Sequence, residues 1–280
     1  MTKLFIALQY VLPQHLLSRL VGFLARTEWS ILKNFLIEQF IRSFKVNMTE
    51  CDRTEPTEFQ HFNDFFTRSL KDGARVIPED ATVCFSPVDG AISQIGTTEN
   101  GRVVQAKGQD YALADLLADD ELAARLQGGA FTTLYLSPKD YHRIHMPFDG
   151  TLTKMIHVPG ALFSVNTATA DAVPGLFARN ERVVCVFDTE HGEVAMVLVG
   201  AMIVASISTA WHGEVTPVRG IQRWDYKDPT PVRLKRGDEL GRFALGSTVV
   251  MCTEPGKLEW DDERDSGDDV RLGMPLGRWS

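Results

Sequence analysis

The clearest indication of fold class comes from three short runs, Phe131-Thr-Thr-Leu-Tyr-Leu136, Val183-Val-Cys-Val-Phe187 and Val194-Ala-Met-Val-Leu-Val199. Each run is rich in β-branched or aromatic residues and glycines stand between the runs, a combination typical of β-strands. The same texture begins near residue 83 of this 280-residue chain and predicts a mainly antiparallel β domain. One helix is expected to interrupt it at residues 113–126, where leucines follow a partly helical spacing.

Two segments around the first run share one sequence pattern. Pro87-Val-Asp-Gly-Ala-Ile-Ser-Gln-Ile95 and Pro147-Phe-Asp-Gly-Thr-Leu-Thr-Lys-Met155 both follow P-x-D-G-x-[IL]-[ST]-x-[IM]. Asp-Gly after proline favours a turn, because glycine adopts positive φ freely and aspartate can bond its own backbone. The segments resemble the hairpins of biotinyl and lipoyl carrier domains, so we expect an arrangement like a barrel-sandwich hybrid, without the carriers' lysine arm.

The amino-terminal region has the pattern of amphipathic helices. Pro13 suits the first turn of one helix, and Thr27 is a candidate N-cap for a second. The first apolar stripe is Leu16, Leu17, Leu20, Val21 and Leu24; the second is Trp29, Leu32, Leu36, Phe40 and Phe44, with Lys33 and Arg42 elsewhere. Such stripes pack against a core or dock on a membrane, and the sequence leaves both open. The predicted fold class is α+β, with a membrane-associating helical region at 1–57 and a catalytic domain at 58–280.

Charge is distributed unevenly along the chain. Residues 1–47 hold six Lys and Arg against two Glu, a net charge of +4, which leaves −12 for the rest of a chain whose formal charge is −8. The acidic total argues against nucleic acid as a partner, whereas basic amphipathic helices are attracted to anionic lipid. The uncharged run 4–18 is shorter than the roughly 20 apolar residues that span a bilayer, and no signal-peptide cleavage site follows it.

The cysteines, the histidine spacing and the carboxyl-terminal tail indicate neither disulfides nor a metal site. The four cysteines are scattered and form no C-x-x-C pair, which argues against disulfides and fits a reducing cytoplasm. The H-x-x-H spacing of His142 and His145 lacks carboxylate or cysteine ligands at familiar distances in sequence, so no metal is expected. The acidic, glycine-punctuated tail beyond Glu254 is predicted to be a solvated end.

A candidate reactive serine lies where a glycine-rich bend leads into a β-branched run. Ser247 follows Gly246 at this bend. From composition alone it is a turn serine. A Gly-Ser peptide at a tight bend can also bring the hydroxyl onto the glycine carbonyl, because glycine tolerates a distorted backbone. That attack would form an ester, and elimination would leave a dehydroalanine that hydrolyses to a pyruvoyl group and ammonia.

Such a serine needs a base, and the base needs an orienting partner. His142 and His145 share the run Tyr141-His-Arg-Ile-His-Met-Pro147, directly after a predicted strand, a position that favours function. Asp89, in the first Pro-x-Asp-Gly turn, is the candidate carboxylate. Each of the three also has an ordinary structural role open to it, and the residues alone do not choose between these alternatives.

These motifs resemble those of bacterial phosphatidylserine decarboxylases. Leu245-Gly-Ser-Thr248 is similar to the family's cleavage motif and the run from Tyr141 to Pro147 to its histidine motif. The likeness extends over residues 58–252 and departs mildly at Val76, where the family commonly has proline. Further similar segments are Phe62-Asn-Asp-Phe-Phe-Thr-Arg68, Ser86-Pro-Val-Asp-Gly90, Gln105-Ala-Lys-Gly108, Pro159-Gly-Ala-Leu-Phe-Ser-Val-Asn166, Leu176-Phe-Ala-Arg-Asn-Glu-Arg182 and Val199-Gly-Ala201.

The resemblance implies self-cleavage between Gly246 and Ser247 into a β chain of residues 1–246 and an α chain of residues 247–280. Asp89, His145 and Ser247 would form the charge relay for this cut. Ser247 would become a covalent pyruvoyl group, the only cofactor, and form an imine with the amine of phosphatidylserine. Loss of carbon dioxide would then give phosphatidylethanolamine for phospholipid biosynthesis.

The same resemblance suggests roles for two further residues and a cellular setting. His142 would assist decarboxylation, and Ser164 would lie near the substrate. The two processed chains would stay together in a homodimer, held peripherally on the cytoplasmic side of the cell membrane. The alternative enzyme is a serine hydrolase using Ser247, His145 and Asp89, although the G-x-S-x-G motif of many hydrolases is missing. The non-enzymatic alternative is a membrane-bound β scaffold.

Overall fold

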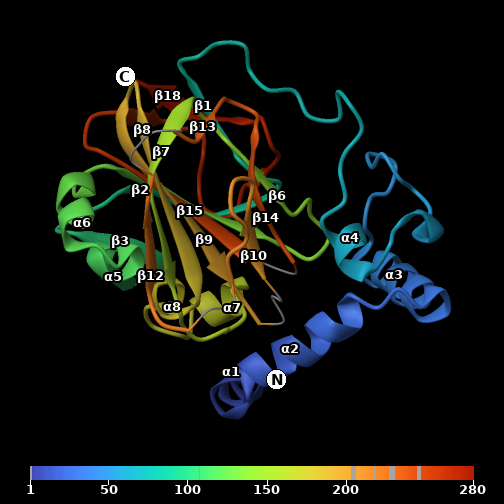
Figure 1. Cartoon of the computed structure of the whole chain (residues 1–280). Coiled ribbons are helices and arrows are strands. Elements are labelled where there is room, and N and C mark those ends of the chain that lie inside the picture. Colours follow the sequence, from blue (N-terminus) through green and yellow to red (C-terminus); the bar gives the residue numbers. More distant parts are fainter. Residues whose placement is uncertain (1, 107, 203–205, 217–218, 227–230, 245–246) are drawn as a thin grey trace.

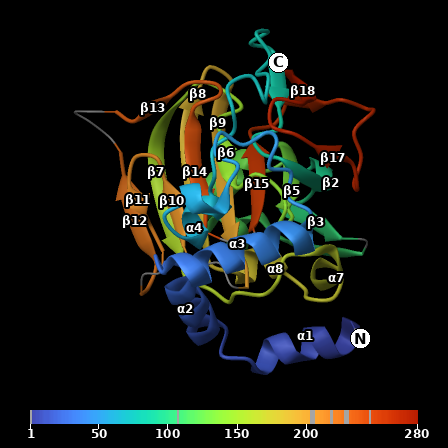
Figure 2. The same cartoon turned by 90° about the vertical axis from the view of Figure 1, so that its right-hand side faces the viewer.

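The computed structural model describes residues 2–106, 108–202, 206–216, 219–226, 231–244 and 247–280. A β domain forms most of the molecule, and helices α1 to α4 lie together at one side of it (Figures 1 and 2). Strands in named sheets pair antiparallel wherever a register is described, so the predicted α+β class is confirmed. The described sheets remain open.

The largest sheet has nine strands and contains all three runs that the sequence predicted as strands. Its order is β12-β7-β8-β9-β15-β5-β2-β17, and β13 also pairs with β7. The bounds are β2 Gly90–Thr97, β5 Ala130–Leu136, β7 Gly150–Val158, β8 Arg182–Thr189, β9 Gly192–Gly200, β12 Gln222–Asp225, β13 Arg233–Leu234, β15 Ser247–Thr253 and β17 Asp269–Val270. Strand β15 therefore lies inside the sheet, with β9 and β5 on its two sides.

Both faces of this sheet are buried, because neighbouring residues of a strand point to opposite sides. Val249 belongs to one hydrophobic core and Val250 to the other. The first core is closed by two smaller sheets, β11-β10-β14-β6 and β1-β18-β16, and the second by short helices. The strands are β1 Val83–Phe85, β6 Arg143–His145, β10 Ile207–Thr209, β11 Gly213–Glu214, β14 Glu239–Phe243, β16 Leu258–Trp260 and β18 Pro275–Trp279; the helices are α5 Leu113–Leu117, α6 Asp120–Leu126, α7 Thr167–Ala170 and α8 Leu176–Arg179. A separate hairpin, β3 Arg102–Ala106 and β4 Gln109–Ala112, completes the domain.

The repeated Pro-x-Asp-Gly pattern has the predicted structural counterpart. Strands β2 and β7 begin at its glycines, Gly90 and Gly150, and each has a register shift at the same position of the pattern, Ser93 and Thr153. At Gly90 a side chain is excluded, since a Cβ atom would lie 2.2 Å from the Tyr135 carbonyl oxygen. The two turns are thus similar in structure as well as in sequence.

Two predictions about local structure were wrong. The helix expected at 113–126 is broken at Ala118, whose φ is 51°, and Asp119 caps the second part by accepting a hydrogen bond from the Leu122 amide (3.0 Å). The tail beyond Glu254 is not a solvated end. Its strands β16, β17 and β18 pair with the domain and bury Leu276 and Trp279, while most of the acidic residues lie between the strands.

The amino-terminal helices are α1 Thr2–Val11, α2 Gln14–Ala25 and α3 Ser30–Phe44, followed by η1 Pro56–Glu58 and α4 Phe62–Phe66. Helix α2 begins after Pro13 as predicted, whereas the N-cap position of α3 is Trp29 rather than Thr27 and has no side-chain capping hydrogen bond. Helix α1 was not predicted as a separate element. Lys33 lies inside because its Nζ donates hydrogen bonds to the carbonyls of Phe59 (2.7 Å) and Pro56 (3.0 Å).

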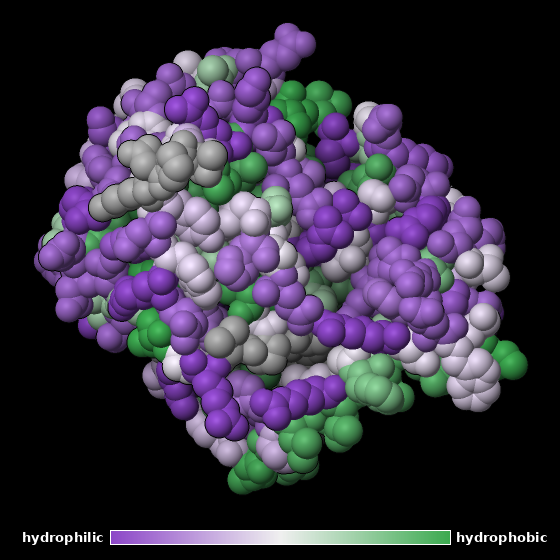
Figure 3. Space-filling view, viewed as in Figure 1, coloured by the Kyte–Doolittle hydropathy of each residue, from purple (hydrophilic) through white to green (hydrophobic). Residues whose placement is uncertain are grey.

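Helix α2 turns its leucines outward. Its buried residues are Gln14, Ser18, Gly22 and Ala25, whereas Leu20 is 57% exposed. Figure 3 shows hydrophobic surface at the lower edge of the molecule, where Figure 1 places α1 and α2. No single described helix is long and apolar enough to cross a bilayer; residues 4–11 and 14–25 reach that length only together, and they meet at a bend of 91°.

Candidate active site

Ser247 is the first residue of β15 and lies in the middle of the large sheet. It pairs with Leu136 of β5 on one side and with Gly200 of β9 on the other. The residue is fully buried, and its Oγ has no hydrogen-bond partner in the described part of the chain. Its predicted cleavage partner Gly246 lies outside the described residues. Of the two residues at the predicted cleavage site, the structure therefore describes the position of Ser247.

His142 is a buried, neutral imidazole. Its Nδ1 donates a hydrogen bond to the Asp140 carbonyl (2.8 Å), and its ring lies against Phe66 with centroids 4.0 Å apart. Burial lowers the pKa of His142 to about 3, and the nearby Arg68 charge acts in the same direction. Because a carbonyl can only accept, Nδ1 carries the proton and Nε2 carries a lone pair. Among the described residues Nε2 has no partner.

His145, at the end of β6, has both ring nitrogens engaged. Nδ1 donates to the Gly237 carbonyl (2.7 Å), which leaves Nε2 as an acceptor for the Tyr141 hydroxyl (3.0 Å). The two rings are stacked with centroids 5.7 Å apart. Burial lowers the pKa of His145, so the imidazole is neutral near pH 7. It has the tautomer that a base acting through Nε2 requires.

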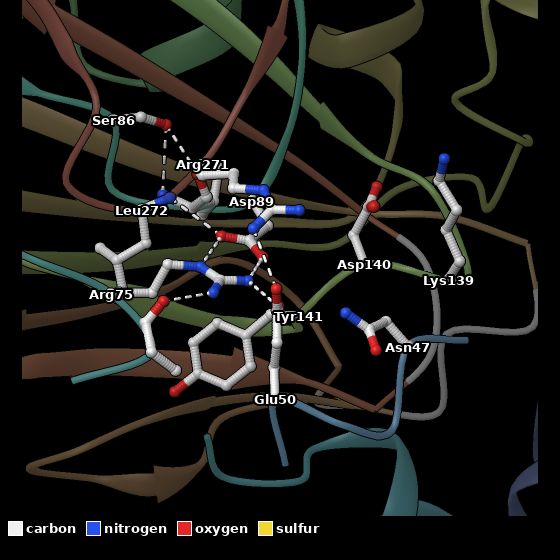
Figure 4. A network of polar contacts seen from close by, with 12 residues as sticks. Asn47, Glu50, Arg75, Ser86, Asp89, Lys139, Asp140, Tyr141, Arg271 and Leu272 are labelled. Atoms are coloured by element: carbon white, nitrogen blue, oxygen red, sulfur yellow. Dashed lines mark hydrogen bonds and ion pairs between the residues drawn. The ribbon is translucent and has the colours of Figure 1, made fainter. Parts of the chain in front are cut away.

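Asp89 is held in a network of polar contacts with Arg75 and Leu272 (Figure 4). One carboxylate oxygen accepts from Arg75 Nε (2.9 Å) and from the Leu272 amide (2.9 Å), and the other accepts from Arg75 Nη2. Arg75 also contacts Glu50 at 2.8 Å. The hydrogen bond to Asp89 raises the pKa of the Arg75 guanidinium, which stays charged. The pair is almost fully shielded from solvent.

Hydrogen bonds among the described residues do not join Asp89, His145 and Ser247 as a relay in this structure. The described hydrogen bonds of His145 go to Tyr141 and Gly237, and those of Asp89 go to Arg75 and Leu272. The charge of Asp89 nevertheless acts on the pKa of both His145 and Tyr141, so these groups lie within electrostatic reach of one another. The relay stays a prediction.

Ser164 lies in the loop after β7, which covers the end of β9. Its amide donates to the side chain of Gln9 (2.8 Å), and its Oγ accepts from the Asn166 amide (3.4 Å). Leu162 of the same loop has its Cδ2 3.7 Å from the position that a Cβ of Gly200 would occupy. Since Gly200 pairs with Ser247, this loop is a close neighbour of the candidate nucleophile.

Four groups that contact the site were missed in the sequence. Tyr141 and Phe66 stood in quoted motifs without an assigned role, and the Gly237 carbonyl has no side-chain signature. Arg75 could have been suspected, because a carboxylate that is buried at a turn, such as Asp89, requires a cation or several hydrogen-bond donors. No cluster of three His, Cys, Asp or Glu suited to a metal occurs in the described ranges.

Comparison with known proteins bears directly on this arrangement. The family model described as phosphatidylserine decarboxylase matches residues 62–278, and a second model, described as PSD, matches residues 4–45. The chain belongs to the phosphatidylserine decarboxylase family. This membership confirms the predicted enzyme class, and the first match contains every site residue predicted above.

Relatives within the family match along almost their whole length. The phosphatidylserine decarboxylase proenzyme of Stutzerimonas stutzeri is 54% identical over 99% of this chain and 94% of its own. The proenzymes of Pseudoalteromonas atlantica and Pseudomonas aeruginosa are 56% and 54% identical, over 96% and 98% of this chain and 95% and 96% of theirs. The word proenzyme in these names describes proteins that are made as precursors.

Proposed function

We propose that this chain is a precursor that cuts itself between Gly246 and Ser247 and then decarboxylates phosphatidylserine to phosphatidylethanolamine and carbon dioxide. The observation that carries the proposal is the Ser247 hydroxyl, which is buried without a partner in the described part of a chain of this family. An unsatisfied buried hydroxyl costs on the order of 1–3 kcal/mol. Such a cost is understandable for a group that is consumed when the enzyme matures.

In the precursor, His145 is the proposed base for the Ser247 hydroxyl. Its Nδ1–H is fixed on the Gly237 carbonyl, and its neutral Nε2 can take a proton once it exchanges the Tyr141 hydroxyl for that of Ser247. Asp89 is the proposed electrostatic partner, because its negative charge favours the imidazolium that forms during the transfer. Arg75 and the Leu272 amide keep Asp89 in place.

The surroundings of Ser247 suit a pyruvoyl group made from that residue. The pairing of β15 with β5 and β9 holds the backbone of residue 247 on both sides, and no side chain projects from its neighbour Gly200. When present, a pyruvoyl carbonyl supplies an electron sink for the electrons released as carbon dioxide leaves. His142 can hold or accept a proton at Nε2, and its neutrality means that it does not bind the substrate carboxylate as a cation.

A groove between the amino-terminal helices and the β domain is the proposed site for the lipid chains. Its volume is about 500 Å³. Phe66, which contacts His142, and Met202, two residues after Gly200, contribute to its wall, so the groove reaches toward the candidate chemistry. The lining is mainly apolar and consists of Val21, Leu24, Ala25, Leu36, Gln39, Phe40, Ser43, Phe44, Phe62, Phe66, Pro138 and Met202.

We place the enzyme on the cytoplasmic side of the cell membrane, held peripherally by α1 to α3. Outward leucines on α2 and the net charge of +4 over residues 1–47 support this placement, because apolar side chains enter the headgroup layer and cations are drawn to anionic lipid. Removal of residues 1–26 should abolish liposome binding. A homodimer is expected from the family resemblance, and its mass in solution tests it.

Intact-mass analysis combined with carbon dioxide release tests the function. Purified protein should consist of two fragments, the smaller with a blocked amino terminus, and should release carbon dioxide from phosphatidylserine. Ser247→Ala should stay full length and inactive. A serine hydrolase would instead keep an unmodified Ser247 in one chain. Processed protein that releases no carbon dioxide would contradict the decarboxylase function itself.

A further inference from the structure

Two glutamines of the amino-terminal helix pair have buried side chains. Gln9 of α1 is 1% exposed and Gln14 of α2 is 9% exposed, although both helices turn large apolar residues to solvent. Burial of an amide is unfavourable unless it is hydrogen-bonded. These side chains therefore need partners, which they find in Thr169, in the loop of residues 162–164 and in each other.

Both glutamines bind the loop that carries Ser164. Gln14 Oε1 accepts a hydrogen bond from the Leu162 amide (2.6 Å), and Gln9 Oε1 accepts from the Ser164 amide (2.8 Å). The two glutamines are also joined, since Gln14 Nε2 donates to the Gln9 carbonyl (2.6 Å). In the described part of the chain these are the only acceptors for the two loop amides. The helix pair thus satisfies backbone donors that the β domain leaves open.

The same loop is fastened to the strand beside Ser247. Asn180 Nδ2 donates to the carbonyls of Phe163 and Gly200, both at 2.9 Å, and its Oδ1 accepts from the Phe163 amide (3.1 Å). Leu162 lies over Gly200, where a larger residue would have its side chain. Gly200 is the cross-strand partner of Ser247. Contacts therefore lead from Gln14 through Leu162 and Gly200 to the catalytic position.

We propose that Gln9 and Gln14 are positioning residues for the reaction: their side-chain carbonyls hold residues 162–164 against the Gly200–Ser247 strand pair. Helices α1 and α2 then build a wall of the active site as well as facing lipid. The choice of phosphatidylserine as the assay substrate rests on the proposed function, but the loop contact does not. Loss of the Gln14 acceptor leaves the Leu162 amide buried and unpaired, so the loop shifts or opens.

The test uses the full chain with Gln14→Met, a change of similar size that removes the acceptor without altering the outward leucines. Turnover of dispersed short-chain phosphatidylserine should fall roughly tenfold per processed enzyme, while sedimentation with anionic liposomes stays at the wild-type level. Normalising to the processed fraction separates turnover from maturation. Gln14→Glu keeps an acceptor and should retain more activity than Gln14→Met. Gln127→Met, in an exposed position distant from the loop in sequence, is the matched control.

Hydrogen exchange gives a second readout that needs no substrate. The peptide covering residues 161–166 should exchange at least roughly tenfold faster in Gln14→Met and in Gln9→Met, while peptides from β8 and β9 keep their protection. Unchanged exchange in the loop would overturn the proposal. So would a loss of activity confined to vesicles, since the helices would then act only as an anchor. If the wild-type protein released no carbon dioxide, the proposed decarboxylase function would be contradicted. The hydrogen-exchange data would still test whether Gln9 and Gln14 hold the loop.

Discussion

The Tyr141 hydroxyl donates a hydrogen bond to His145 Nε2 over 3.0 Å, and this is the nitrogen that would receive the proton of Ser247. The other nitrogen is committed to the Gly237 carbonyl, so the ring cannot offer a second acceptor. In the proposed relay, Tyr141 and Ser247 would therefore compete for one lone pair. The stacked rings keep His145 in place whichever hydroxyl it binds.

Replacement of Tyr141 by Phe should speed self-cleavage. The ring would still stack on His145, but a competing hydrogen bond worth about 1 kcal/mol would be lost, which corresponds to about a fivefold faster reaction. The rate is measured as the disappearance of full-length precursor on denaturing gels after synthesis in vitro. Tyr135→Phe, on strand β5 beside β15, is the control. Cleavage as slow as in His145→Ala would mean that Tyr141 takes part in the proton transfer.

The Arg75–Asp89 pair should matter far more for stability than a surface pair. Arg75→Met leaves the Asp89 carboxylate buried without its cation, and the free energy of unfolding should fall by about 3 kcal/mol. Arg278 pairs with Asp80 at 3.3 Å in an exposed position, where solvent screens the charges, so Arg278→Met should change the free energy of unfolding far less than Arg75→Met. Urea unfolding of both variants in a Ser247→Ala background, where the chain stays intact, makes the comparison. Equal midpoints would show that the Asp89 charge is well solvated after all.

Local patterns were enough to predict three central strands and to single out the candidate site residues. The runs at β8 and β9 are buried on both faces and are therefore continuous in apolar residues, and the run at β5 is rich in β-branched and aromatic residues, so all three can be recognised without tertiary information. The Pro-x-Asp-Gly repeats predicted two similar strand starts because turn chemistry is local. The candidate serine and histidines were recognisable in the same way, from short motifs.

What remained hidden depends on contacts between distant parts of the chain. Asp89 accepts a hydrogen bond from the amide of Leu272, which lies 183 residues later in the chain. No local sequence pattern predicts a contact between residues so far apart. Helical periodicity predicts which residues of α2 share a face, but it does not predict which face is buried. In this structure the buried face consists of Gln14, Ser18, Gly22 and Ala25. The tail was misjudged because its acidic residues outnumber the few apolar ones that enter the core. Solvent-facing turns tolerate such charge at little cost.

If the chain is cut between Gly246 and Ser247 as proposed, the two resulting chains should remain together without a covalent link. Strand β15 lies between β9 and β5 and is paired along its length with both, and its valines fill both hydrophobic cores. The small chain also contributes β16, β17 and β18, so its removal would leave four strands, β1, β2, β5 and β9, without a pairing partner on one side. Processed protein should therefore elute as one species in native size exclusion and split into two bands only on denaturing gels. Dissociation in buffer alone would contradict this.

Acid should destabilise the folded enzyme partly through His142. Its folded pKa of about 3 lies below the ordinary value of 6.5, so between these limits the unfolded chain binds a proton that the folded protein does not. The contribution of the neutral His142 ring to the free energy of unfolding is fully present above pH 6.5 and is lost as the pH falls toward 3. The slope for this one group reaches about 1.4 kcal/mol per pH unit.

The variant His142→Asn keeps a donor for the Asp140 carbonyl and removes the titrating ring. Its free energy of unfolding, again measured in the Ser247→Ala background, should decline less steeply than that of the parent between pH 6.5 and pH 4. His212→Asn, which changes an exposed histidine, is the matched control. If the curves for His142→Asn and its parent ran parallel through this range, the folded protein would bind the proton as readily as the unfolded chain. The buried ring beside Phe66 would then have to carry a charge, which its apolar contact disfavours.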